Sequence, residues 1–175
     1  MLQCQCGKVA FEISGAPFLA ATCCCDSCAE AADIFSRLPH APDVRDDIGA
    51  TPYGMMRKDR IACTRGAEHL RSLRLSPAAK TRRVVATCCN TPVFLEFKGG
   101  HWLSVYKGMW PEGARPAITV RTMTGDREDR AALPQDIPNL KAQSLGFFWK
   151  LFAAWAAMGF RAPATGLGET PLEVR

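Results

Sequence analysis

Three cysteines in one short loop are the residues best suited to chemistry. Cys23, Cys25 and Cys28 form a C-x-C-x-x-C array, which can place three sulfurs around one metal ion. Cysteine binds metal or attacks a substrate as the thiolate, and the start of a helix favours that charged form. Ser27 with Glu30 three residues later matches a capping box. The sequence therefore predicts a short helix with Ser27 as its N-cap and Cys28 as its first residue.

Three protein sulfurs would leave the fourth position of a tetrahedral ion open. An open position is typical of catalytic rather than structural zinc, because water, a carbonyl oxygen or a thiolate can enter it. If Cys24 supplied a fourth sulfur, the site would be closed and structural. Thiol redox chemistry through Cys25 and Cys28 is a weaker interpretation, because that motif usually follows a strand in a βαβ unit and none is evident.

The composition favours metal binding over disulfide bonds. The chain has 175 residues and nine cysteines, and its N-terminus lacks the pattern of a secretory signal. Clustered cysteines then indicate metal sites in a reducing compartment, and we expect a cytoplasmic protein. The net charge of +5 comes from scattered basic residues without interleaved aromatics. Nucleic-acid binding is therefore not expected.

Alternating and apolar segments predict a mainly β domain over residues 1–123. Loops are expected at 39–54 and 76–80, and residues 124–143, which are polar and contain two prolines, read as a linker. Asn90 tolerates a positive φ and suits the turn that we expect before residue 93. His40, His69 and His101 read as surface residues rather than ligands. Strands are expected at 9–13, 58–63, 68–75, 84–85, 93–97, 102–106 and 117–123.

The C-terminal segment, residues 144–175, contains an apolar helix and a tail. Residues 144–160 are apolar nearly all round, with Lys150 as the only charge, so we expect burial on several sides. The helix could dock onto the domain, form a homodimer through residues 144–160, or contact a membrane interface. Its length is about 17 residues against the ~20 that a membrane span needs, so no transmembrane span is expected.

Three cysteine motifs, in this order, carry a resemblance to a known family. They are Cys4-Gln5-Cys6-Gly7-Lys8-Val9, then the array from Cys23 to Cys28, then Cys89-Asn90-Thr91-Pro92. This order resembles that of the glutathione-dependent formaldehyde-activating enzymes, a family that includes the centromere protein V group. Arg83 stands where the family usually has an arginine before the late cysteines. The resemblance covers about residues 2–106.

The resemblance implies a β-tent fold of short antiparallel strands with two zinc sites. Its structural Zn²⁺ would be held by Cys4, Cys6 and Cys89, and its catalytic Zn²⁺ by the Cys23, Cys25 and Cys28 array. The first cysteine of the late pair is missing, because Ala86 occupies its position. Cys88 or Cys63 could substitute. Adjacent residues of a strand point to opposite faces, so Cys88 and Cys89 could both bind only if the turn distorts.

The family's activity implies a carbon–sulfur lyase-like enzyme. The expected substrate is a small thiol or aldehyde adduct such as S-hydroxymethylglutathione, formed from glutathione and formaldehyde. Asp26 could orient a ligand or act as a base, and Arg37, Arg65 and Arg83 could bind the carboxylates of a tripeptide. The alternative function is a non-catalytic, zinc-stabilised binding module whose C-terminal helix docks a partner.

Overall fold

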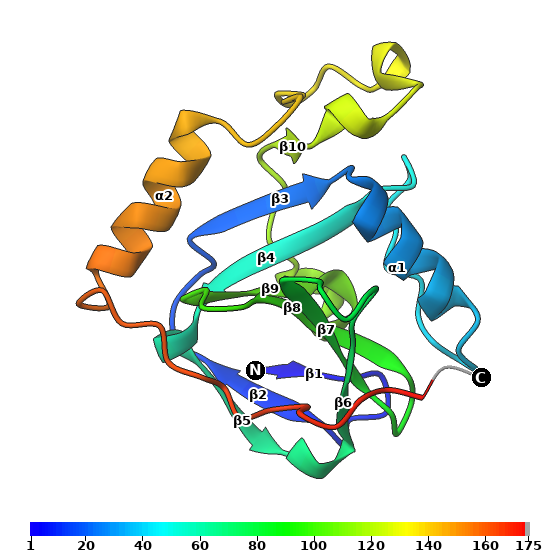
Figure 1. The fold of residues 1–175 in the computed structure, drawn as a ribbon, viewed down its shortest axis with the longest axis vertical. Helices are drawn as coiled ribbons and strands as arrows, with labels where there is room; N and C mark the ends of the chain where they lie inside the picture. The colour runs from blue at the N-terminus through cyan, green and yellow to red at the C-terminus, as the bar shows by residue number, and fades with distance from the viewer. Residues whose placement is uncertain (174–175) are drawn as a thin grey trace.

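The computed structural model describes residues 1–173 and shows a mainly β fold with two helices, as the sequence predicts. One short helix, α1, follows the central cysteine array, and the other, α2, lies near the C-terminus (Figure 1). Short 3₁₀ turns connect several strands. The strands are β1 (Leu2–Gln3), β2 (Ala10–Ile13), β3 (Leu19–Cys23), β4 (Thr51–Arg57), β5 (Ile61–Arg65), β6 (Leu70–Leu73), β7 (Thr81–Ala86), β8 (Thr91–Phe97), β9 (Trp102–Tyr106) and β10 (Arg121–Thr122).

The strands form two sheets. The small sheet has the order β1-β2-β5, and the large sheet has the order β10-β3-β4-β9-β8-β7-β6. Between the strands of residues 1–173, the pairings are antiparallel except that of β10 with β3. Gly66 turns the chain after β5 with a φ of +78°, and a Cβ there would lie 2.4 Å from the Lys8 carbonyl oxygen. The close approach of the two segments therefore requires glycine.

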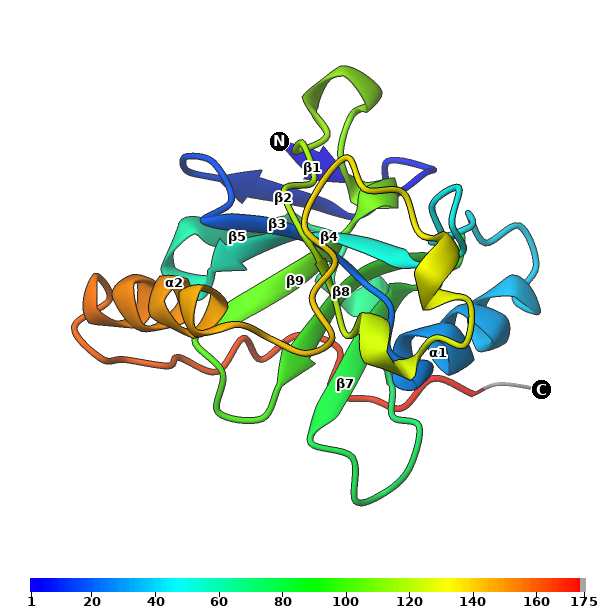
Figure 2. The ribbon, with the colours of Figure 1, turned by 90° about the horizontal axis from the view of Figure 1, so that it is seen from above.

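The two faces of the large sheet pack against different elements. One face contacts the small sheet through a core that includes Phe11, Met56, Phe94 and Val105. The opposite face contacts α1 through Phe35 and its neighbours and contacts α2 at another point. The two helices lie apart, with strands of the large sheet between them (Figure 2). The alternation of side chains across each strand thus assigns one face to the sheet-on-sheet core and the other to the helices.

Helix α1 (Asp26–Ser36) begins earlier than the sequence predicts. Cys25 is its N-cap residue, and no side chain caps the helix start, so the prediction of Ser27 as N-cap was wrong. The backbone N–H groups of Cys28 and Ala29 both donate to the Cys25 carbonyl oxygen. Cys28 is therefore the third helical residue, and its side chain lies on the buried face with Ala31 and Phe35.

Helix α2 (Leu145–Ala156) docks on the domain with one face only. Phe147 and Leu151 pack against the cluster formed by Leu19, Ala21 and Met55. The expectation of burial on several sides was wrong, because the opposite face is open to solvent. No helix among residues 1–173 is long and apolar enough to cross a membrane. The exposed large side chains of this helix and its end are Leu145, Phe148, Trp149, Phe152, Trp155 and Phe160.

Several element boundaries differ from the sequence prediction. The expected strand at 58–63 begins with a 3₁₀ turn and becomes β5, and the strand expected at 117–123 shrinks to the two residues of β10. Part of the loop expected at 39–54 is the start of β4. His101 is buried, with 7% of its surface exposed, because Trp102 and Trp155 pack on its ring. Its assignment to the surface was therefore wrong.

Candidate metal centres

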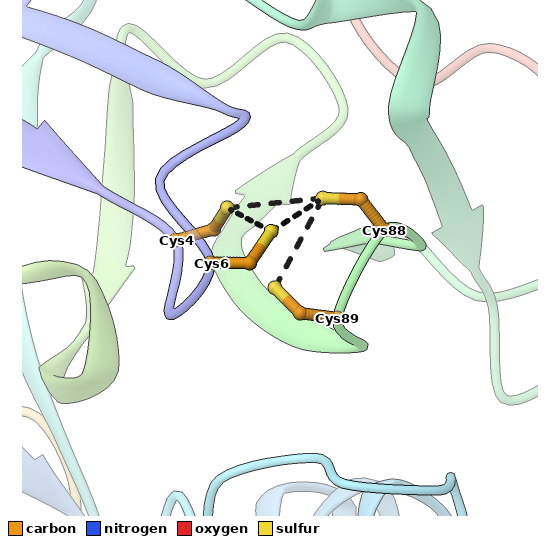
Figure 3. A group of neighbouring side chains, drawn as sticks. All are labelled: Cys4, Cys6, Cys88 and Cys89. Atoms are coloured by element: carbon orange, nitrogen blue, oxygen red, sulfur yellow. Dashed lines mark hydrogen bonds between the residues drawn. The ribbon is translucent and has the colours of Figure 1, made fainter.

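Four cysteine sulfurs from two distant turns converge at the junction of the two sheets. Cys4 and Cys6 lie between β1 and β2, and Cys88 and Cys89 lie between β7 and β8 (Figure 3). The Sγ atoms of Cys4 and Cys6 are 3.7 Å apart, and Cys88 Sγ lies 3.8 Å from Cys4 Sγ and 3.4 Å from Cys6 Sγ. We call these residues the four-sulfur cluster.

Both Cys88 and Cys89 join the cluster because they lie in a turn and not in a strand. Residues 87–90 form the turn between β7 and β8, and Asn90 ends it with a φ of 54°, as its residue type suggests. Strand alternation therefore does not apply to the pair, and their Sγ atoms are 4.0 Å apart. Cys63 stays outside the cluster and directs its thiol to the Arg65 carbonyl oxygen. Of the two residues that could substitute for the missing cysteine at position 86, Cys88 joins the cluster and Cys63 does not.

The spacing of the four sulfurs fits a tetrahedral metal ion. A Zn–S bond of about 2.3 Å places neighbouring ligand sulfurs about 3.8 Å apart, and the four S–S separations given above run from 3.4 to 4.0 Å. Gly7 turns the backbone behind the first pair with a φ of 73°. The Val9 N–H then donates to Cys4 Sγ over 3.3 Å. Donation from the backbone stabilises a thiolate, which is the form that ligates metal.

The thiol of Cys89 is the acidic member of the four-sulfur cluster. Burial raises its pKa, but hydrogen bonds from the Thr91 hydroxyl and the Cys6 backbone outweigh this effect, and the pKa falls to about 6. Burial and the neighbouring sulfurs raise the pKa of Cys88. The cluster therefore favours one thiolate before any metal binds, and metal binding would displace the remaining protons.

The central array forms a second group, the three-sulfur cluster. Cys23 ends β3, Cys25 caps α1, and Cys28 lies in the first turn of α1. The Sγ atoms of Cys23 and Cys25 are 3.4 Å apart, and all three sulfurs lie within 4.8 Å of one another. Cys24 does not close the site. It is buried, lies outside the cluster, and its backbone N–H pairs with Thr122 of β10.

One thiolate is also favoured in the three-sulfur cluster. A hydrogen bond from Cys23, followed by one from Cys28, lowers the pKa of Cys25 to about 2. The same hydrogen bond raises the pKa of Cys23. The Tyr53 hydroxyl lies 3.4 Å from Cys28 Sγ, and the Ser27 hydroxyl lies 3.3 Å from Cys25 Sγ. The three residues thus offer convergent sulfurs with polar neighbours, which fits a metal ion with one open position.

Arg83 places a buried positive charge beside this cluster. Its side chain is completely buried in β7, and its Nη2 donates to the Ser27 carbonyl oxygen over 2.7 Å. Its Nε and Nη1 find no hydrogen-bond partner among the described residues. Glu96, a buried carboxylate in the adjacent strand, pairs with Lys58 and Arg82 instead. A buried cation needs a negative partner, and three thiolates around a divalent ion would carry a net charge of −1.

A cavity of about 480 Å³ opens on the three-sulfur cluster. Cys23, Cys25 and Cys28 line one part of it, the helix-facing side of the large sheet forms its floor, and α2 supplies a wall. This volume lies within the range of ~300–1,000 Å³ that small-molecule sites occupy. The residues of the four-sulfur cluster do not line this cavity. The two clusters therefore differ in access to small molecules.

Sequence reasoning missed several residues of this cavity. Asp126 is the charged side chain that lines it, yet its segment reads as a linker. Trp102, Phe147 and Leu151 also line it, and their apolar character indicated only packing. Asp26, which the sequence suggested as a base, is exposed and does not line the cavity. No local pattern reveals these residues, because the tertiary fold brings them to the array.

The fold and the two clusters define a mainly β protein with cysteine groups that could hold metal ions. The chain belongs to a family described as a family of unknown function (DUF6151), whose model matches residues 1–109. Both clusters lie inside this range, and α2 lies beyond it. No match is found among curated proteins. A similar solved structure is that of a Rhodobacter sphaeroides structural genomics target, with 16% identity, a TM-score of 0.47, and coverage of 79% of this chain and 97% of that chain.

Proposed function

We propose that the three-sulfur cluster holds a catalytic Zn²⁺ and that the protein makes or breaks the carbon–sulfur bond of a small thiol adduct. The observation that carries this proposal is the convergence of three sulfurs on the wall of a cavity large enough for a substrate. The order of the cysteine motifs, shared with the glutathione-dependent formaldehyde-activating enzymes, supports it. For that family the adduct is S-hydroxymethylglutathione.

The proposed reaction joins a thiol to an aldehyde without any change in oxidation state. The S–H bond breaks, the sulfur electron pair forms the C–S bond, and the carbonyl oxygen takes up a proton. In the reverse direction the C–S bond breaks, its electron pair returns to sulfur, and the hydroxyl proton leaves as the carbonyl reforms. When bound, the zinc ion would stabilise the thiolate or the carbonyl oxygen as a Lewis acid.

Residues of the chain would bind the metal, orient a ligand and transfer the proton. Cys23, Cys25 and Cys28 would hold the metal, and the Tyr53 hydroxyl orients Cys28 through its hydrogen bond. Asp126 is the charged group at the cavity and can accept or return the hydroxyl proton of the adduct. The apolar walls exclude water, which strengthens electrostatic interactions within the site.

Nine free cysteines fit a reducing compartment such as the cytoplasm.

The four-sulfur cluster would hold a structural Zn²⁺ through Cys4, Cys6, Cys88 and Cys89. Four protein sulfurs complete the tetrahedron and leave no position for a substrate. Cys88 then replaces the ligand that the resemblance expects at residue 86. One open site and one closed site in the same chain support a β-tent protein of the formaldehyde-activating type.

The test is to measure zinc per chain and catalysis for the wild type and for Cys25→Ser. We expect about two zinc ions per chain to fall to about one, because only the three-sulfur cluster loses a ligand. Catalysis is read as the exchange rate between formaldehyde and its adducts with a panel of small thiols, glutathione among them. In Cys25→Ser this rate should fall to the uncatalysed value while circular dichroism stays unchanged. A wild type that holds zinc but accelerates no exchange contradicts the enzymatic proposal.

A second candidate function is a zinc-stabilised binding module. The exposed face of α2 favours it, because Phe148 and Trp149 are 55% and 68% exposed. Large exposed apolar surfaces often mark sites of interaction. A second copy of the chain, paired through residues 144–160, is one partner that would cover this face. An inactive wild type together with loss of the fold in Cys25→Ser would favour the module over the enzyme.

A further inference from the structure

We infer that the thiol adduct accepted at the three-sulfur cluster is uncharged and apolar, and that an anionic tripeptide such as glutathione is a poor ligand. This inference rests on the proposed function and narrows its substrate class. It comes from the lining of the cavity that opens on the cluster. Apolar side chains provide most of the exposed surface of that lining, its polar positions are hydroxyl and amide groups, and its one charged side chain is a carboxylate.

The floor of the cavity is a surface of the large sheet that is apolar at its centre and includes Thr81, Ser104 and Thr122 as polar positions. Ala21 of β3 and Met55 of β4 line it, and so do Leu95 and Phe97 of β8. Leu95 and Phe97 are two positions apart, so the alternation of the strand directs both to the same face. Trp102 extends this surface at the start of β9, where its ring packs 5.4 Å from that of Phe97. The floor therefore offers apolar contacts to a ligand bound at the sulfurs.

Helix α2 forms the facing wall with three more apolar side chains. Phe147, Phe148 and Leu151 line the cavity, and Leu151 also packs on the cluster around Met55. These residues lie beyond the part of the chain that the family model matches. An apolar group between this wall and the sheet would be removed from water on two sides. Removal of apolar surface from water favours binding roughly in proportion to the area buried.

The cavity offers hydroxyl and amide donors but no cationic side chain, among the described residues, to pair with a carboxylate. Among the described residues, no lysine, arginine or histidine lines it, and Asp126 repels anions. Glutathione carries two carboxylates and one ammonium group at neutral pH; Asp126 could pair with the ammonium group, but each unpaired carboxylate would carry a large desolvation cost. Arg83 does not line the cavity and donates to the Ser27 carbonyl oxygen. Lys58 and Arg82 do not line the cavity and are paired with Glu96.

The test compares ligands at the metal itself and does not depend on turnover. The full chain is loaded with Co²⁺, and the visible absorption bands are followed as thiol is added. The thiols are 2-phenylethanethiol, which is apolar, glutathione, which is anionic, and 2-mercaptoethanol as a small neutral reference. We expect half of the spectral change at a concentration about tenfold lower for 2-phenylethanethiol than for glutathione, because tenfold corresponds to ~1.4 kcal/mol.

Two variants of lining residues and one control test whether the difference in thiol affinity arises in the cavity. Leu151→Ala should raise the half-saturating concentration of 2-phenylethanethiol about tenfold, since it removes apolar contact in the wall. Trp149→Ala is the matched control, because Trp149 lies on the same helix, is 68% exposed and does not line the cavity. Thr81→Lys adds a cation at a half-buried lining position without altering the helix. It should lower the half-saturating concentration of glutathione and leave that of 2-mercaptoethanol unchanged.

The outcomes separate the inference from the function on which it rests. If glutathione perturbs the cobalt bands at a concentration equal to or below that of 2-phenylethanethiol, the inference is overturned and the proposed function stands. If cobalt binds but no thiol alters its bands, the proposed function is overturned. An effect of Trp149→Ala as large as that of Leu151→Ala would also overturn the inference, because contact in the cavity would then not determine affinity.

Discussion

The two cysteine clusters use the same ligand type in different settings. The four-sulfur cluster joins turns 82 or more residues apart, one from each sheet, whereas the three sulfurs of the other cluster come from six consecutive residues. The first has a sulfur for each corner of a tetrahedron, and the second has three sulfurs and a cavity beside it. Under the proposed function, the number of ligands and the space on the fourth side, rather than the residue type, would separate a structural metal site from a catalytic one.

The difference in chain separation also predicts a difference in stability. A metal at the four-sulfur cluster would tie the β1–β2 turn to the β7–β8 turn, and so would link the small sheet to the large one. A metal at the three-sulfur cluster would link only the end of β3 to the start of α1. Closing a long loop constrains the unfolded chain more than closing a short one. Loss of the four-sulfur cluster should therefore cost more stability.

The largest expected effect comes from Cys6→Ser. Cys6 is exposed, so this change removes a ligand and little packing. We expect the melting temperature of the zinc-loaded protein to fall by ~10 °C or more, because structural metal binding contributes several kcal/mol of folding free energy. Differential scanning calorimetry measures the shift. Cys63→Ser is the control, since the half-buried Cys63 lies in neither cluster. Equal melting temperatures for Cys6→Ser and this control would contradict a structural role.

A smaller effect is expected from Arg83→Met, which tests the charge beside the three-sulfur cluster. Methionine keeps a long unbranched chain in the buried site but removes the cation that would offset an anionic metal centre. We expect the zinc affinity of this cluster to fall ~10–100-fold, as for other groups that support metal ligands indirectly. Competition with a chromophoric chelator measures the affinity.

The variant Arg82→Met is the matched control for Arg83→Met. Arg82→Met removes a guanidinium that pairs with Glu96 and does not contact the residues of α1 that carry the cluster. The four-sulfur cluster should retain its metal in both variants. If Arg83→Met and Arg82→Met release zinc at the same chelator concentration, the buried charge does not serve the cluster.

Local patterns in the sequence were sufficient for much of the fold and for grouping the cysteines. Alternation located most strands, and the spacing of Cys23, Cys25 and Cys28 predicted that they converge. The helix start was misplaced, because a capping box pattern does not require that the box forms, and Cys25 takes the N-cap position. The membership of Cys88 depended on turn geometry, which the rule for strands does not describe.

Long-range packing was beyond the reach of the sequence. An apolar helix predicts burial, but only the tertiary structure shows that α2 buries one face and leaves Trp149 exposed. Arg83 matches the position of an arginine in the resembled family, but nothing in its sequence neighbours indicates that it is fully buried. The apolar lining of the cavity combines strands of the large sheet with α2, which begins at Leu145, whereas β9 ends at Tyr106. Such surfaces become visible only when the elements are placed in space.

The smallest expected effect concerns His101, which helps to hold the helical wall of the cavity. Its ring stacks 6.0 Å from that of Trp155, and burial lowers its pKa below the ordinary value of 6.5. The unfolded chain therefore binds a proton more readily than the folded chain as the pH falls below about 6.5. Stability that is present above this pH should be lost as the pH drops through the folded-state pKa.

The measurement is urea unfolding, followed by tryptophan fluorescence at about pH 7.5 and about pH 5.5. We expect the wild type to lose more unfolding free energy between these conditions than His101→Gln, in which the titrating group is absent. His69→Gln is the control, because His69 is half-buried and lies in a 3₁₀ turn away from α2. Acid also weakens thiolate–metal bonds, but both variants keep all nine cysteines, so that contribution cancels in the comparison. If the unfolding free energy of the wild type and that of His101→Gln depend equally on pH, protonation of this ring does not destabilise the cavity wall. The difference between the two clusters would then lie in the number of their sulfurs and in the charge beside them.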